Sequence, residues 1–165
     1  MRLLVAGIGN IFFGDDGFGS EVARVLAESP IDDVKIEDFG IRGMHLAFEL
    51  VAGYERALVI DAVPRGGQPG TLYVLEPDVA PQKAMPDAHG MDLQNVLAFV
   101  RTIGGDPPPI TVVGCEPSVA EEQIGLSDAV SAAVAPAVAL VRRLVGEALR
   151  ESGSRQERKT LWTEV

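Results

Sequence analysis

The stretch LLVAGIGNIFFGDDGFG, from Leu3 to Gly19, decides the fold of this chain. It begins with a continuous apolar run, Leu3 to Ile8, which is typical of a strand buried on both faces of a parallel sheet. A glycine-containing turn follows, and Asp15 and Asp16 then precede an amphipathic helical pattern. We expect one of these aspartates to cap that helix. A strand, a turn and a helix in this order are the first unit of an α/β fold.

The rest of the chain alternates between short strand-like runs and longer helical patterns. We expect further strands at 34–39, 56–63, 71–77 and 110–115, and further helices at 44–53, 92–105 and 126–150. Only PRGGQPG separates the strand at 56–63 from the one at 71–77, which is too short for a crossover, so we expect this pair to be antiparallel and the second strand to lie towards an edge. The pattern predicts a three-layer α/β/α sandwich with a mostly parallel sheet and one antiparallel edge strand. In such folds, ligands bind in the crevice outside the carboxyl ends of the strands.

Composition narrows the function classes. The chain has 165 residues and a net charge of −10, which argues against nucleic acid and against anionic membrane surfaces as partners. We expect one domain over residues 1–150 and a polar, flexible tail over 151–165. The lone Cys115 excludes an intramolecular disulfide framework and a thiolate-rich zinc site. We find no signal peptide and no run long enough to span a bilayer, so we expect a cytoplasmic protein.

The opening turn is a poor dinucleotide site. Gly7 and Gly9 fit the fingerprint Gly-x-Gly-x-x-Gly, but Phe12 occupies the third glycine position. Asp15 and Asp16 would also repel a phosphate at the helix N-terminus. A nucleotide-binding module is therefore disfavoured.

Three residues are candidates for a site at the strand ends. Two adjacent carboxylates exceed what a helix cap requires, so we assign Asp16 to the site. Asp61 ends the most apolar strand, where a carboxylate is costly unless it is paired, hydrogen-bonded or bound to a metal. His89 lies in the loop before the helix at 92–105, a position that is also common for an ordinary surface histidine, whereas we expect His45 to be structural. Two carboxylates and one imidazole suit zinc, nickel or a similar divalent ion and leave coordination positions open.

No side chain is placed as an obvious nucleophile. The sequence contains no Gly-x-Ser-x-Gly motif. Cys115 ends an apolar strand, which favours a packed, inert thiol. Glu116, the next residue, is placed to line the same crevice.

The ordered set of motifs resembles the hydrogenase maturation proteases. The similarity rests on GIGNIFFGDDGFGSEVA, DFGIRGMHLAFEL, LVIDAV, DAHGMDLQNVL and VVGCEPSVAEEQIGLSDAV, which follow in that family's order from Met1 to about Arg150. The resemblance implies a cytoplasmic endopeptidase that removes a short C-terminal extension from a nickel–iron hydrogenase large-subunit precursor after nickel insertion.

The resemblance also implies roles for individual residues. The family's metal-contacting positions correspond to Asp16, Asp61 and His89, the residues selected above, and they are the expected catalytic residues as well. The divalent metal is expected to be nickel carried by the precursor, with zinc or cadmium able to take its place. Asp38 matches a family aspartate and is a candidate for substrate binding, although it is equally a candidate turn former. A non-enzymatic nickel or zinc carrier with the same three ligands is the alternative function.

Overall fold

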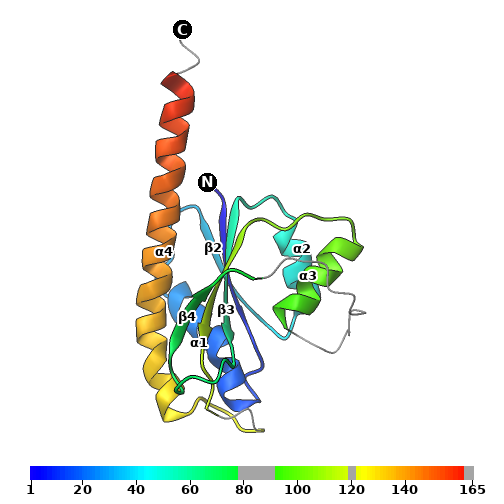
Figure 1. Cartoon of the computed structure of the whole chain (residues 1–165), viewed down its shortest axis with the longest axis vertical. Helices are drawn as coiled ribbons and strands as arrows, with labels where there is room; N and C mark the ends of the chain where they lie inside the picture. The colour runs from blue at the N-terminus through cyan, green and yellow to red at the C-terminus, as the bar shows by residue number, and fades with distance from the viewer. Residues whose placement is uncertain (78–91, 119–121, 162–165) are drawn as a thin grey trace.

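The computed structural model describes residues 1–77, 92–118 and 122–161. The strands form a five-stranded sheet (Figure 1) and are β1 (Leu3–Ile8), β2 (Val34–Gly40), β3 (Arg56–Ala62), β4 (Leu72–Leu75) and β5 (Ile110–Cys115). The helices are α1 (Phe18–Ala27), α2 (Gly43–Leu50), α3 (Leu93–Thr102) and α4 (Asp128–Leu161), and a 3₁₀ turn, η1 (Gly14–Gly17), precedes α1. Apart from this turn and the end of α4, the elements agree with those predicted from apolar periodicity to within a few residues.

The strand order in the sheet is β2-β1-β3-β5-β4. Neighbouring strands are parallel except β4 and β5, which run antiparallel with Tyr73 opposite Gly114. β4 is therefore the antiparallel edge strand that the sequence predicts, but the expectation that it pairs with β3 is wrong, because β5 lies between them. The connection PRGGQPG is too short for a crossover helix. It can nevertheless span the distance of about 10 Å from β3, past β5, to β4.

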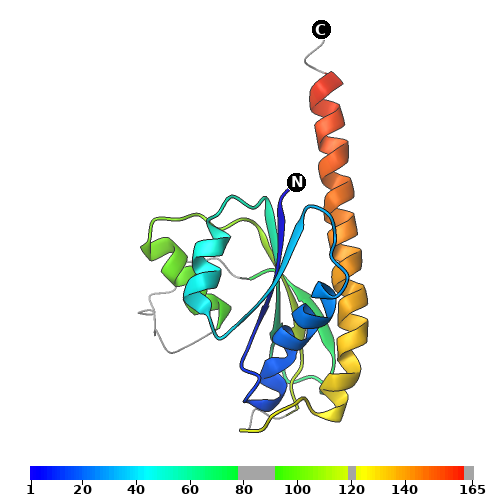
Figure 2. The ribbon, with the colours of Figure 1, turned by 180° about the vertical axis from the view of Figure 1, so that it is seen from behind.

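Two helical layers cover the sheet. α1 and α4 lie on one face, and α2 and α3 lie on the other (Figures 1 and 2). Leu4 and Ile8 of β1 belong to the core cluster beneath α2 and α3, whereas Leu3 and Val5 belong to the cluster beneath α1 and α4. Successive side chains of a strand point to opposite faces, so a strand that is covered on both faces is apolar throughout. The predicted three-layer sandwich is confirmed.

Two glycines of the opening stretch allow α1 to lie directly on the sheet. A Cβ on Gly7 would lie 2.2 Å from the carbonyl oxygen of Gly19, and a Cβ on Gly19 would lie 2.1 Å from the carbonyl oxygen of Ile60. Both distances are far below van der Waals contact, so a larger residue at either position would push α1 away from β1 and β3. These close approaches of helix and sheet give the opening stretch a structural need for glycine that involves no phosphate.

Helix α4 continues to Leu161, so the expected end of the helix at Arg150 is wrong. The sequence after Arg150 is polar, but Glu, Arg, Gln and Lys are good helix formers, and polarity alone does not end a helix. The C-terminal part of α4 extends beyond the sheet (Figure 1), and Glu151 forms an ion pair with Arg56 at 3.1 Å. The division into a domain of residues 1–150 and a tail of 151–165 stays a prediction.

The expectation that no run is long enough to span a bilayer is wrong for one segment of α4. By length and composition, Asp128–Gly153 is apolar enough to cross a bilayer. One face of this segment packs on the sheet, where Val130, Ala137 and Val141 are fully buried. A helix that packs on a core meets the same criterion of length and composition.

Candidate active site

Asp16 and Asp61 lie at the same end of the sheet, where the parallel strands have their carboxyl ends. Asp61 lies near the carboxyl end of β3, and Asp16 lies in η1, which follows β1. β1 and β3 are parallel neighbours, with Gly7 opposite Ile60. The segments that follow Gly7 and Ile60 therefore start side by side, as the rule for parallel sheets predicts.

Asp15 is a structural residue. Its side chain is fully buried and accepts hydrogen bonds from the backbone N–H of Ser118 at 2.7 Å and from that of Ser127 at 2.7 Å. The Ser127 hydroxyl donates a further bond to Asp15 at 2.9 Å. The carboxylate thus joins η1 to the segment after β5 and to the start of α4.

The expectation that Asp15 or Asp16 caps α1 is wrong. No side-chain hydrogen bond caps α1, whose N-cap residue is Gly17, and none caps η1. Asp16 Oδ2 accepts a hydrogen bond from the backbone N–H of Asn10 at 2.7 Å. A Cβ on Gly9 would lie 1.8 Å from the carbonyl oxygen of Asp16, so the two backbones are in close contact. These contacts fix Asp16 at the turn that follows β1.

Asp61 is a partly buried carboxyl group with an abnormal pKa. Burial is the main cause and, together with the nearby carboxylate of Asp16, raises its pKa from 3.8 to about 8. The backbone N–H of Ala62 acts in the opposite direction, and Asp92 adds to the rise. In the part of the chain that the structure describes, no lysine or arginine forms an ion pair with Asp16 or Asp61. Burial and the charge of Asp16 thus favour the neutral form of Asp61, and a bound cation would favour its charged form.

The third predicted ligand, His89, lies outside the described residues. Within 1–77, 92–118 and 122–161, no group of three His, Cys, Asp or Glu side chains is arranged to hold a metal ion. The described residues thus supply Asp16 and Asp61 from the predicted set, and the role of His89 stays a prediction. Two carboxylates are suitable oxygen ligands for a divalent ion such as zinc or nickel.

Sequence reasoning missed Asp92. It is the N-cap residue of α3, and its Oδ1 accepts a hydrogen bond from the backbone N–H of Asn95 at 2.8 Å. Its charge also contributes to the raised pKa of Asp61. An aspartate directly before an apolar helical pattern predicts a cap, but its proximity to Asp61 depends on how α3 packs on the sheet.

Cys115 has no features of a nucleophile. It is fully buried, and burial, with a smaller effect from the charge of Asp15, raises the pKa of its thiol to about 11. A thiol with this pKa is almost entirely protonated near neutral pH. The prediction of a packed thiol is confirmed, and its raised pKa is consistent with an inert one.

Glu116 organises the turn that follows β3. Its carboxylate accepts hydrogen bonds from the backbone N–H groups of Arg65 at 2.8 Å and Gly66 at 3.0 Å, and from the Tyr73 hydroxyl at 2.8 Å. Burial alone would raise the pKa of Glu116, but these donors hold it below its usual value. Its carboxylate is occupied by protein donors, so the described contacts make Glu116 a structural residue.

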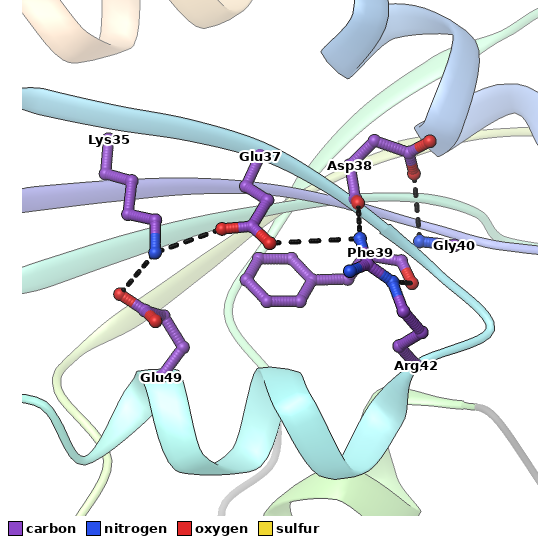
Figure 3. A network of polar contacts seen from close by, with 7 residues as sticks. All are labelled: Lys35, Glu37, Asp38, Phe39, Gly40, Arg42 and Glu49. Carbon is purple, nitrogen blue, oxygen red and sulfur yellow. Dashed lines mark hydrogen bonds and ion pairs between the residues drawn. The ribbon is translucent and has the colours of Figure 1, made fainter.

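Asp38 closes β2 as a turn former. Its Oδ1 accepts a hydrogen bond from the backbone N–H of Gly40 at 2.9 Å, and its carbonyl oxygen accepts one from the Arg42 guanidinium (Figure 3). The Asp38 carboxylate points away from α2, whereas Glu37 points towards α2 and pairs with Lys35 at 3.0 Å (Figure 3). The turn-forming interpretation is thus confirmed, while a role in substrate binding stays a prediction.

The structure does not give His45 the structural role that its position in a helical pattern suggested. It lies on the exposed side of α2. We expected a structural histidine, but its side chain is not part of the core. It also lies on a helix rather than at the carboxyl ends of β1 and β3.

The sequence of this chain is similar to those of hydrogenase maturation proteases. A family model for hydrogenase maturation proteases matches residues 20–144, a range that includes Asp61 and begins after Asp16. The hydrogenase 2 maturation protease of Escherichia coli is 36% identical over 160 residues, which cover 93% of this chain and 93% of that protein. The hydrogenase expression/formation protein HupD of Rhizobium leguminosarum is 36% identical over 142 residues, which cover 82% of this chain and 69% of that protein.

Solved structures agree with the sequence relatives. The hydrogenase maturating endopeptidase HybD of Escherichia coli superposes with a TM-score of 0.72 at 32% identity, covering 93% of this chain and 94% of that one. A hydrogenase 2 maturation peptidase from Thaumarchaeota archaeon SCGC_AB-539-E09 gives a TM-score of 0.68 at 33% identity, covering 88% of this chain and 99% of that one. The similarity therefore extends over the whole sandwich.

Proposed function

This chain belongs to the hydrogenase maturation protease family, and we propose that it removes the C-terminal extension of a nickel–iron hydrogenase large-subunit precursor after nickel has been inserted. We further propose that the reaction takes place in the cytoplasm. A net charge of −10 makes nucleic acid an unsuitable partner.

The observation that best supports this function is that Asp16 and Asp61 lie near each other at the carboxyl ends of β1 and β3. Both carboxyl groups lie at the carboxyl end of the parallel sheet, and burial together with the charge of Asp16 raises the pKa of Asp61. A precursor that carries nickel near its cleavage point would bring the missing positive charge to this position. The nickel is then part of the substrate, and zinc or cadmium is expected to bind the same carboxylates.

The roles of the protein residues follow from this arrangement. The Asn10 N–H orients the Asp16 carboxylate, and β3 presents Asp61 from the neighbouring strand. Asp16 and Asp61 would hold a divalent ion there, and such an ion would supply Lewis-acid chemistry at the scissile carbonyl or at an attacking water. Cys115 is buried and protonated, so we assign the attack to water and not to this thiol.

The test is to incubate the purified protein with a precursor that still carries its extension and to follow the mass of the precursor. We expect the wild type to shorten a nickel-loaded precursor and to leave a nickel-stripped precursor intact. Asp16→Asn and Asp61→Asn should each lower the cleavage rate by at least about 100-fold, because each removes a ligand charge. His45→Ala is the matched control and should cleave normally.

The possible outcomes separate the alternatives. Equal cleavage of both precursors would exclude recognition of nickel in the substrate. A protein that binds nickel or zinc but never shortens the precursor would be a carrier and not a protease. Normal cleavage by Asp16→Asn and Asp61→Asn would remove both residues from the site.

A further inference from the structure

Five large apolar side chains are exposed around the turn that follows β1. They are Ile11 at 52%, Phe12 at 62%, Phe13 at 38%, Ile41 at 58% and Ile124 at 83% of full exposure. We call this set the apolar rim. Scattered exposed apolar residues are normal in proteins, whereas a contiguous group usually marks an interaction site.

The apolar rim is contiguous because its residues border three adjoining hollows. A groove of about 830 Å³ lies between α1 and the start of α4 and is lined by Ile11 and Ile124. A hollow of about 390 Å³ is lined by Phe12, Phe13 and Ile124, and one of about 250 Å³ is lined by Ile11, Phe12 and Ile41. Each hollow thus shares a side chain of the rim with the next one, so the three form one surface.

The turn that carries Ile11, Phe12 and Phe13 of the rim is held by hydrogen bonds of its backbone N–H groups. The Phe12 N–H donates to Asn10 Oδ1 at 3.0 Å, and the Phe13 N–H donates to the Asn10 carbonyl at 3.0 Å. The Gly14 N–H donates to the carbonyl oxygen of Gln123 at 2.8 Å, which ties the turn to the segment before α4. Aromatic side chains on a fixed backbone lose little entropy when they bind a partner, which is a property of good interfaces.

The same turn is part of the candidate active site. The backbone N–H of Asn10 donates to Asp16, and the next residue, Ile11, is the first residue of the rim. The rim therefore lies directly beside Asp16, within reach of a protein whose chain end enters the candidate active site.

The charged side chains that line the hollows of the rim and form no ion pair within the described residues are acidic. Asp38 and Glu122 line its hollows, and within the described residues neither forms an ion pair. Arg24 borders the large groove and Arg42 borders the smallest hollow, but they are paired with Glu21 at 2.7 Å and with Glu37 at 3.8 Å. The surface thus fits a partner that presents apolar side chains bordered by basic ones.

We propose that the apolar rim is the docking surface for the folded body of the hydrogenase large-subunit precursor. This proposal rests on the proposed function. The body of the precursor binds Ile11, Phe12 and Ile124, and its chain end extends from there to the two carboxylates. Docking on a surface outside the reaction centre lets the protein recognise its precursor by more than the sequence at the cleavage point.

The experiment measures KM for cleavage of the nickel-loaded precursor. Phe12→Ser and Ile124→Ser should each raise KM by about tenfold or more, as expected for central interface residues. The lost rate should be recovered at high precursor concentration, which a folding defect would not allow. Val74→Ser and Ile103→Ser are matched controls, because Val74 and Ile103 are exposed at 49% and 41% and line none of the three hollows, so their KM should be unchanged.

A charge variant and the state of the free protein complete the test. Glu122→Lys should raise KM and weaken its dependence on salt, because it reverses an acidic charge at the rim. If the wild type cleaves and the rim variants keep its KM, the docking surface is wrong while the proposed function stands. If the wild type itself fails to cleave, the proposed function fails. If sedimentation shows a wild-type dimer that Phe12→Ser dissociates, the rim is occupied by a second copy and the proposal is overturned.

Discussion

The buried carboxylate of Asp15 accepts two hydrogen bonds from Ser127, one from the backbone N–H at 2.7 Å and one from the hydroxyl at 2.9 Å. These residues are 112 positions apart in the chain. Their contact joins the turn after β1 to the start of α4, which lies on the same side of the sheet as α1. The neighbouring residue Asp16 instead accepts a hydrogen bond from the nearby backbone N–H of Asn10 and belongs to the candidate active site.

Asp15→Ala should destabilise the fold by about 2–4 kcal/mol, because it removes the buried carboxylate that accepts three hydrogen bonds from the partly buried donors of Ser118 and Ser127. The free energy of unfolding in urea measures this effect. Asp16→Ala is the paired control, and we expect it to change stability by less than about 1 kcal/mol, since it loses one contact at a partly exposed position. Equal losses in the two variants would contradict the division of roles between the adjacent aspartates.

Asp61→Asn should make the protein more stable at pH 8 while abolishing cleavage. The pKa of Asp61 is raised from 3.8 to about 8, so between these values the folded state holds more protons than the unfolded state. The stability of the wild type therefore falls as pH rises through this window, and the neutral amide removes that loss. Each kcal/mol regained should raise Tm by about 2–4 °C.

Thermal melts of wild type and Asp61→Asn from pH 4 to pH 8, with a chelator present, test this prediction. The two melting temperatures should be similar at pH 4 and should diverge towards pH 8. Added zinc or nickel should raise Tm of the wild type more than Tm of Asp61→Asn, since the variant lacks a ligand charge. Parallel pH profiles would show that Asp61 has an ordinary pKa.

Glu116→Gln should loosen the turn after β3. The pKa of Glu116 lies below its usual value, so its charge stabilises the fold above pH 4.5, and this contribution is lost as pH falls through the lowered pKa. The variant should therefore melt below the wild type at pH 7 and approach it in acid. Hydrogen exchange at the Arg65 and Gly66 amides should become at least about tenfold faster, because both donate to this carboxylate.

Glu76→Gln is the control for Glu116→Gln, because Glu76 is exposed. It should leave the exchange of the Arg65 and Gly66 amides unchanged. If Glu116→Gln also leaves their exchange unchanged, the carboxylate does not hold the turn.

Removing residues 151–165 should cost less than about 1 kcal/mol of stability and leave cleavage measurable. One contact that is lost is the ion pair of Glu151 with Arg56, in which both side chains are exposed, and such pairs contribute little. The Arg56→Gln variant isolates that pair in the full-length chain. A truncated protein that loses cooperative unfolding would show that the end of α4 is part of the folded unit.

Much of the fold follows from the sequence alone, because it rests on local periodicity. The continuous apolar run of β1 indicated a strand covered on both faces, and the alternation of strands and helices indicated the three layers. Asp61 was also visible locally, since a carboxylate at the end of an apolar strand is unusual. Cys115 could be predicted as inert from the same kind of pattern.

The tertiary structure decided what depends on contacts between distant segments. Asp15 and Asp16 are adjacent and chemically identical, and only the positions of Ser118 and Ser127 give Asp15 its structural role. The partner of β4 was likewise decided by the place of β5 in the sheet. Periodicity predicts which face of an element is buried but not which element covers it, because that choice depends on the packing of the whole core. The raised pKa of Asp61 has the same origin, since burial and a neighbouring charge exist only after the chain has folded.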